Sequence, residues 1–419
     1  MSLNWKISSP RGSTSAVKAD APLKEAEFSA PWLSPTVLPD NPMGNDWGVL
    51  WDGKVESIGL DSLLALVRQG PGATQWNGKT ERNPVVFVAV PGVNRIIPLA
   101  ECAEFLPSIF ELNGSSYQSD RSKNGWIFYS LAAICIALAL FGHGREAFLP
   151  ALYATDAGTA HFEAWLALRK LRMHPREYLK SLAAQARYAY WQQAGGKWAN
   201  CRTFCMVGAW LLIFVVQAFM VFATSSKEPR PDIIAAALIK PLVHTEPWRL
   251  LTGPMLHGST MHILMNAMAM LSLGSILERS AHRNVLAPVW LLAALSGSLL
   301  SWITLPADSV GASGGLMGLF GFLLVMVWRR RALMPPDFLQ SLLRSLLAMA
   351  MLGILAQDII DNAAHLGGLL AGGLLGIWVF REPEGSLPLQ DTTMLRTIGL
   401  FSETLFIGLA VFTLLKLIQ

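Results

Sequence analysis

The residues best suited to chemistry lie in apolar parts of the chain, where polar side chains are rare. The sharpest is Ser313, in the string Gly311-Ala312-Ser313-Gly314-Gly315, immediately before an apolar segment that we expect to be helical. A serine at a helix N-terminus lies beside free backbone N–H groups and the positive end of the helix dipole, which both stabilise a developing oxyanion. The string predicts a nucleophile, and a glycine-rich packing motif is the alternative.

A second polar segment contains His257, His262 and Asn266. His262 and Asn266 are four residues apart, so a helix carries both on one face. A zinc half-site is the alternative to a hydrogen-bonding pair. Asparagine is a poor zinc ligand and the HExxH glutamate is missing, so the spacing favours the hydrogen-bonding pair.

A third segment places His365 before Gly368 and Gly372, which form a G-x-x-x-G pattern. This pattern lets one helix approach another at backbone distance. If the neighbour is the helix that begins at Ser313, His365 comes within hydrogen-bond reach of the serine hydroxyl. Those are the positions of nucleophile and general base in covalent acyl transfer.

The composition indicates that membrane helices position these residues. Only 15% of the 419 residues are charged and 52% are hydrophobic, whereas an average soluble domain is roughly 25% charged. The net charge of +4 argues against a nucleic-acid binder driven by bulk charge. We expect an all-α polytopic membrane protein, because apolar runs near bilayer length lie at 126–142, 205–224, 261–277, 286–305, 316–328, 342–356, 363–380 and 398–417.

The remaining chain divides into three polar segments. Residues 1–45 are rich in proline and serine and predict a flexible tail. Residues 46–115 predict a small α+β soluble domain with short strands on either side of an Asp52-Gly53 turn. Residues 143–204 are basic and amphipathic and predict a cytoplasmic linker, either on the inner leaflet or as a soluble helix.

Charge also predicts which side of the membrane each loop faces. The arginines at 329–331 mark a cytoplasmic end, whereas the loops at 306–310 and 357–362 contain aspartates without lysine or arginine and are expected outside. If 126–142 spans the membrane, this orientation places the α+β domain outside. The alternative is that 126–142 is a re-entrant or packed helix.

Taken in this order, the three motifs resemble the rhomboid family of intramembrane serine proteases over about residues 205–380. Trp248-Arg249, together with Gly274 and Glu278, adds to the resemblance. It implies a six-helix core at 205–380, with one extra helix before it at 126–142 and one after it at 398–417.

The resemblance also implies roles for the polar residues. Ser313 is the expected nucleophile and His365 the general base. His262 and Asn266, with the Ser313 backbone N–H, are expected to form the oxyanion hole. His257 either keeps water near the site or is structural. The expected supporting residues are Gly311, Gly314, Met317, Gly368, Gly372, Trp248 and Arg249.

Two of the supporting expectations are specific enough to check. Met317 stands where many family members carry an aromatic residue against the catalytic histidine, and a thioether can still pack on an imidazole ring. Trp248 and Arg249 are expected to anchor their loop in the outer leaflet, with Arg249 reaching a lipid phosphate.

The function implied is an intramembrane serine endopeptidase that cuts single-pass transmembrane proteins in the lipid bilayer, at small residues near a helix breaker. No cofactor, metal or nucleic acid is expected. We expect a multi-pass protein of the bacterial inner membrane with the active site facing the outer side. A non-proteolytic chaperone or scaffold that binds transmembrane helices is the alternative, and the presence of both serine and histidine favours the protease.

Overall fold

The computed structural model describes most of the chain from residue 200 onward, except 225–230, 358, 383 and 384. It also describes short strand and helix segments between 36 and 98 and single residues between 173 and 191. The expected helix at 126–142 lies outside the described residues.

The described strands form a small antiparallel sheet in the order β1-β7-β6-β2-β3, beside a two-stranded sheet of β4 and β5. β2 pairs with β3 from Trp47↔Ile58 to Trp51↔Lys54, a register that fits the predicted hairpin. β1 lies within the segment expected to be a tail, and it pairs with β7. The strands are β1 Thr36–Val37, β2 Trp47–Trp51, β3 Lys54–Ile58, β4 Thr74–Trp76, β5 Lys79–Glu81, β6 Phe87–Ala89 and β7 Arg95–Pro98.

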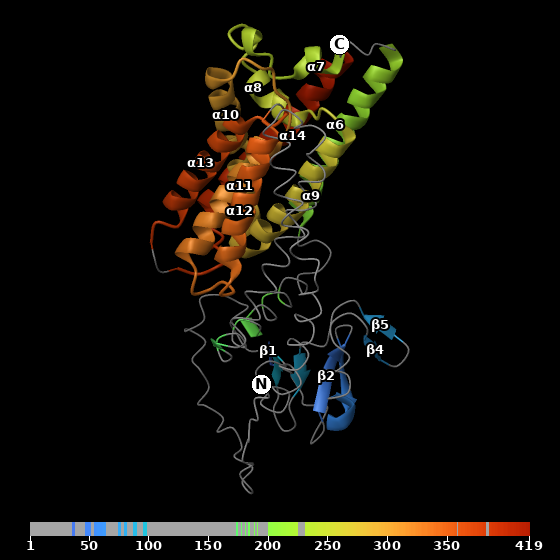
Figure 1. Cartoon of the computed structure of the whole chain (residues 1–419), viewed down its shortest axis with the longest axis vertical. Helices are drawn as coiled ribbons and strands as arrows, with labels where there is room; N and C mark the ends of the chain where they lie inside the picture. Colours follow the sequence, from blue (N-terminus) through green and yellow to red (C-terminus); the bar gives the residue numbers. More distant parts are fainter. Residues whose placement is uncertain are drawn as a thin grey trace, which may run out of the picture.

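A bundle of helices makes up the rest of the described chain (Figure 1). Its long helices are α6 Cys201–Thr224, α9 Thr260–Leu277, α10 Leu286–Thr304, α11 Ser313–Arg329, α12 Phe338–Leu355, α13 Asn362–Val379 and α14 Thr393–Ile418. Short helices connect them: α7 Pro231–Ala236, η6 Lys240–Leu242, α8 Arg249–Thr252, η7 Gly253–Met255, η8 Glu278–His282 and η9 Arg283–Val285. The expected fold, a helical membrane bundle beside a small domain that contains strands, is confirmed.

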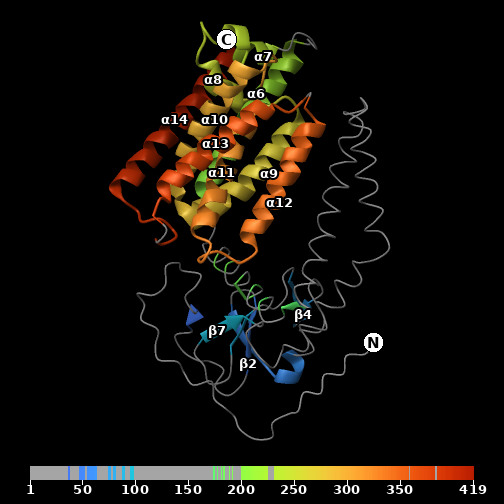
Figure 2. The same ribbon diagram turned by 60° about the vertical axis from the view of Figure 1, so that its left-hand side comes forward.

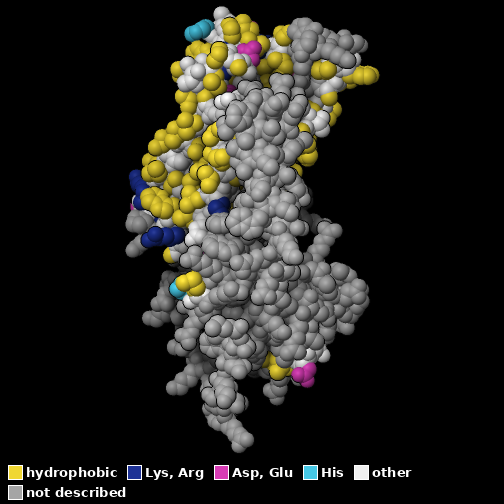
Figure 3. Space-filling view, viewed as in Figure 1, with side chains coloured by type: hydrophobic (Ala, Val, Ile, Leu, Met, Phe, Trp, Pro, Cys, Tyr) yellow, Lys and Arg dark blue, Asp and Glu magenta, His cyan; other side chains and the backbone are white. Residues whose placement is uncertain are grey.

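The outside of the bundle is apolar. Phe222 is 81% exposed, Phe219 65% and Leu347 64%. Hydrophobic side chains cover the visible face of the helices, and lysine and arginine side chains gather at the lower end (Figure 3). Soluble proteins rarely expose such a continuous apolar surface, so these helices are suited to lipid. Among the described residues, five helical segments are long and apolar enough to cross a membrane.

Glycines bring α11 and α13 together at backbone distance. A Cβ atom at Gly368 would collide with the carbonyl oxygen of Gly314, and one at Gly372 with that of Gly318. Most of α11 is buried as a result. The predicted G-x-x-x-G contact is therefore confirmed, and it is the contact that places His365 beside the start of α11.

Helix α11 is short for a membrane helix. Its 17 residues correspond to about 25 Å, less than the ~30 Å hydrocarbon core. If Arg329 lies at one membrane surface, Ser313 at the other end of α11 lies below the opposite surface.

Glu278 joins α9 to α6. Its carboxylate accepts hydrogen bonds from the backbone N–H groups of Arg202 and Thr203, each at 3.0 Å, and from Thr203 Oγ1 at 2.7 Å. A Cβ atom at Gly274 would lie 2.7 Å from the same Oγ1. The two residues that added to the family resemblance therefore act in helix packing.

The extra helix expected at 398–417 is present as α14, at the outer edge of the bundle (Figure 2). Arg202 forms a 2.6 Å ion pair with Glu403. The rings of Trp290 and Phe406 meet edge to face at 5.3 Å. Helix α14 therefore packs on α6 and α10.

Part of the predicted basic linker packs on the bundle. Described residues 181, 183, 184, 188 and 191 are helical, and Ser181 and Tyr188 are buried. Tyr188 Oη lies 2.5 Å from Ser280 Oγ, and the Ser181 hydroxyl donates to Asp337 at 2.7 Å. This face of the segment binds protein, an arrangement that neither expected form of the linker included.

Candidate active site

Ser313 is the first residue of α11, as predicted. The chain enters the helix through Gly311, whose φ of +131° is rarely adopted by any residue with a side chain. The preceding loop is held by backbone bonds between Leu238 and Ser309 at 3.0 and 3.2 Å and by a 3.1 Å bond from Gly311 N–H to Gly253 O. The free N–H groups of the first turn therefore occupy a fixed position beside the serine.

His262, in the first turn of α9, points at the corner that leads to Ser313. A Cβ atom at Gly311 would lie 2.6 Å from Cε1 and 2.7 Å from Nε2 of His262. The Gly258 N–H donates to His262 Nδ1 at 3.4 Å, so the neutral ring carries its proton on Nε2. The ring therefore presents an N–H donor next to the serine loop, as an oxyanion hole requires.

Asn266 lies one turn further along the same face of α9. Its side chain is only 6% exposed, and within the described part of the chain its Nδ2 atom has no hydrogen-bond partner. A buried donor without a partner costs about 1–3 kcal/mol. Such a donor is suited to an acceptor that exists only during a reaction.

His365 lies in the first turn of α13. Asp361 caps this helix by accepting the Ala364 N–H at 2.8 Å. A Cβ atom at Gly314 would lie 3.2 Å from the Ala364 carbonyl oxygen, so the residues that flank Ser313 and His365 touch. The structure therefore brings the backbone next to Ser313 against the backbone next to His365 and places the His262 ring against the loop before Ser313, and the catalytic roles of these residues stay predictions.

His257 packs beneath His262. The two rings meet at 5.2 Å in an edge-to-face arrangement, and the His257 side chain is completely buried. Gln217 of α6 accepts the His257 N–H at 3.0 Å and donates to its carbonyl oxygen at 3.3 Å. Burial, followed by the charge of His262, lowers the pKa of His257 to about 3, so this ring is neutral at physiological pH.

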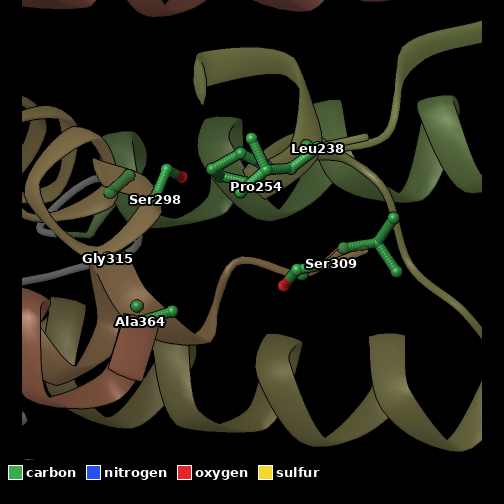
Figure 4. Close-up of a pocket in the computed structure, with 11 residues that line it drawn as sticks. Leu238, Pro254, Ser298, Ser309, Gly315 and Ala364 are labelled. Carbon is green, nitrogen blue, oxygen red and sulfur yellow. The ribbon is translucent and has the colours of Figure 1, made fainter. Parts of the chain in front are cut away.

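A small pocket is lined by residues on either side of Ser313 in the chain, among them Ser309 and Gly315 (Figure 4). The Ser298 hydroxyl of α10 borders it on one side, and Ser309 and Ala364 border it on another. The remaining lining residues are Leu238, Gly253, Pro254, Ala294, Val310, Gly311, Gly314 and Gly315. Glycine, alanine and serine make up most of this lining. The lining side chains are therefore small and carry few polar groups, and the pocket lies close to the backbone of the serine loop.

The expectation that Arg249 reaches a lipid phosphate is wrong. Arg249 is only 4% exposed, and it donates to the carbonyl oxygens of Ala237 at 2.9 Å and Ile234 at 3.0 Å and to Glu246 at 2.5 Å. Because its donors are used inside the protein, it braces the loop and does not reach a lipid phosphate. Trp248 lies under this guanidinium at 4.6 Å.

The neighbour of Trp248 on its other side was not predicted. The Trp248 ring meets Phe412 of α14 edge to face at 5.6 Å. Met317 is buried in α11, and its support of His365 remains a prediction. Sequence reasoning also missed Asp361, although an aspartate directly before an apolar helix is a recognisable N-cap signal.

A family model, "Rhomboid domain", matches residues 244–382. The chain is 34% identical over 139 residues to "Putative rhomboid protease YdcA" of Bacillus subtilis (strain 168), which covers 33% of this chain and 69% of that protein. It is 32% identical over 128 residues to "Rhomboid protease GluP" of the same organism, which covers 30% of this chain and 24% of that protein.

"RHOMBOID-like protein 4" of Arabidopsis thaliana is 33% identical over 140 residues, which covers 33% of this chain and 36% of that protein. The chain thus spans about a quarter of the length of GluP and about a third of the length of RHOMBOID-like protein 4. The matched region contains Ser313, His262, Asn266 and His365 together with the helices that carry them. With its apolar helices and this match, the chain is an integral membrane protein that belongs to the rhomboid family.

Proposed function

We propose that this chain is an intramembrane serine endopeptidase whose nucleophile and base are Ser313 and His365. One observation supports the proposal: Ser313 begins a helix whose entry loop lies against the His262 ring, and the glycine-packed helix that carries His365 touches the residue after the serine. A helix-packing role alone does not require these three groups to converge. Homologues named as proteases in Bacillus subtilis support the same activity.

The reaction would proceed in two steps. Ser313 Oγ attacks the scissile carbonyl carbon while His365 takes its proton, and His365 then passes the proton to the leaving amine. The carbonyl oxygen becomes an oxyanion, which accepts hydrogen bonds from the Ser313 N–H, His262 Nε2 and Asn266 Nδ2. Water attacks the resulting ester with His365 as base again, which releases the acid and restores the serine.

The substrate would be a single-pass transmembrane protein. Its peptide bonds are hydrogen-bonded within a helix, so the segment must unwind before attack, and helix-breaking residues near the cut make this easier. The pocket at the loop before Ser313 is small and lined mainly by glycine, alanine and serine. It favours a small side chain next to the scissile bond.

The test is cleavage of a transmembrane substrate in liposomes by the wild-type protein, Ser313→Ala and His365→Ala. Ser272→Ala is the matched control, because Ser272 is exposed on α9. We expect cleavage and fluorophosphonate labelling of the wild type and the control, and neither with the other two variants. Equal cleavage by all four proteins would disprove the dyad.

The alternative of a non-proteolytic chaperone or scaffold predicts a different result. Such a protein would bind the transmembrane segment and release it intact, and Ser313→Ala would bind as the wild type does. Within the described residues the buried Asn266 Nδ2 has no hydrogen-bond partner, and helix binding alone gives this donor no acceptor. We therefore favour the protease.

We also propose that the active site opens on the side opposite to the arginines at the end of α11, which for a bacterial inner membrane is the outer side. A cysteine placed at exposed Ala307, in the loop before Ser313, tests this orientation in intact cells. Reaction with a membrane-impermeant maleimide is expected. Labelling only after the membrane is opened would reverse the orientation.

A further inference from the structure

Lys240 is a buried cation that the active-site description does not include. It is the first residue of η6, in the loop between α7 and α8, and it is 7% exposed. Lysine is rarely buried unless its ammonium group is paired, because removing the charge from water is costly. The partners of Lys240 therefore show what the buried charge does.

The first partner lies on the loop that leads to the nucleophile. The Lys240 backbone N–H donates to Asp308 Oδ1 at 3.0 Å. Two residues earlier, Leu238 pairs with Ser309 through backbone bonds at 3.0 and 3.2 Å. The segment around Lys240 is therefore attached to the loop that passes through Gly311 into Ser313.

The second partner leads to the helix that carries the base. The Lys240 ammonium group donates to the hydroxyl of Ser301, which is fully buried on α10, and this hydroxyl donates to Asp361 Oδ2. Asp361 is the N-cap of α13. Its other carboxylate oxygen accepts the Ala364 N–H at 2.8 Å, and its carbonyl oxygen accepts the His365 N–H at 3.1 Å.

The charges around this chain of bonds are complementary. Burial lowers the pKa of Lys240, and the carboxylates of Asp361 and Asp308 oppose that effect. A hydrogen bond with a charged donor or acceptor is stronger than one between neutral groups. The Lys240 ammonium group therefore restrains the first turn of α13 through Ser301 and Asp361, while the Lys240 backbone N–H holds the serine loop through Asp308.

We propose that Lys240 is a positioning residue for the Ser313–His365 pair, acting through Ser301 and Asp361 on the helix that carries His365. The proposal rests on the proposed protease function. Nucleophile and base are on different helices, so their separation depends on how α13 is placed against the loop before α11. A displacement of about 1 Å can lower the rate of a positioned reaction by about 100-fold.

The experiment compares Lys240→Met, Lys240→Arg and Ser301→Ala in the full-length protein, with Lys416→Met as the matched control. Lys416 is a cation on α14 that contacts the Trp248 ring, and its ammonium group donates to Gln419 at the end of the same helix. Cleavage of a transmembrane substrate gives kcat and KM, fluorophosphonate labelling reports the reactivity of Ser313, and thermal unfolding reports the fold.

We expect Lys240→Met and Ser301→Ala to lower kcat and the labelling rate by roughly 10- to 100-fold with KM within about twofold of wild type, since positioning affects the reacting groups. Lys240→Arg should restore part of the loss, and the control should behave as wild type. The double variant that combines Lys240→Met with Ser301→Ala should be no slower than Lys240→Met alone, because both changes break the same chain of bonds.

Three results would overturn the proposal: an unchanged kcat in a folded Lys240→Met protein, a raised KM with unchanged kcat, or fully additive losses in the double variant. If Lys240→Met does not fold, Ser301→Ala alone decides between these results. Failure of the proposed function is distinguishable, because then the wild type itself does not depend on Ser313.

Discussion

Gly311→Ala is expected to disable the oxyanion hole while leaving nucleophile and base in place. The new Cβ atom would lie 2.6 Å from Cε1 and 2.7 Å from Nε2 of His262. Carbon atoms in contact are normally about 3.5–4.0 Å apart, so the imidazole has to retreat by roughly 1 Å. The φ of +131° adds strain of about 1–3 kcal/mol for a residue with a side chain.

The displaced ring can no longer donate to the oxyanion. Loss of one such donor lowers kcat by about 10²–10³-fold in serine proteases. We expect Gly311→Ala to show a kcat in this range below wild type, measured by cleavage of a transmembrane substrate in liposomes. Unfolding should begin at a lower temperature because of the backbone strain. Gly208→Ala is the matched control, since a Cβ atom at Gly208 meets nothing within 4 Å.

A double-variant cycle separates the collision from the strain. In a His262→Ala background the ring that collides is absent, so Gly311→Ala should lower kcat by less than about threefold further. The reasoning is refuted if Gly311→Ala cleaves at the wild-type rate. It is equally refuted if the loss is as large without His262 as with it.

Three further variants test other contacts. Gly372→Leu forces a side chain into the backbone of α11 at Gly318 and should lower the free energy of unfolding, measured by denaturation in detergent, by at least about 1–3 kcal/mol. Gly373→Leu is the control, because a Cβ atom at Gly373 meets nothing within 4 Å. Tyr188→Phe removes the 2.5 Å bond to Ser280 and should cost about 0.5–1.5 kcal/mol in the same assay, and no change would mean that the packed linker face adds no stability. Arg396 holds the pKa of Asp391 below its usual range through a hydrogen bond, so this pair should stabilise α14 above about pH 4, and the stabilisation should be lost as the pH falls further. Asp391→Asn should abolish this dependence in a series of unfolding measurements at falling pH. A retained dependence would contradict the assignment.

The sequence by itself predicted the apolar helices that the structure describes after residue 200, and it singled out the candidate reactive groups. Ser313 begins its helix where the glycine string ends, and His262 and Asn266 share a face because four residues make about one helical turn. The collision between Gly368 and Gly314 shows why the G-x-x-x-G pattern was informative. Local spacing and the cost of polar groups in lipid were sufficient for these predictions.

Other features depended on contacts between distant segments. Arg249 could be expected to face lipid from its place in the loop, but the carbonyl groups of Ile234 in α7 and of Ala237 directly after it accept its hydrogen bonds. The packing of Tyr188 on Ser280 joins residues 92 positions apart, and no periodicity indicates such a pairing. The extra helix was predicted, whereas its attachment through Glu403 was not.

The clearest division lies between the reactive groups and what holds them. Ser313 and His365 can be chosen from the sequence, because each occurs in a short motif whose chemistry is local. Lys240, Ser301 and Asp361 come from three segments separated by about sixty residues each, and the N-cap signal of Asp361 does not indicate the other two partners. Only the folded bundle brings a cation, a hydroxyl and a helix cap into one chain of bonds, because hydrogen bonds require separations of about 3 Å that sequence spacing does not specify.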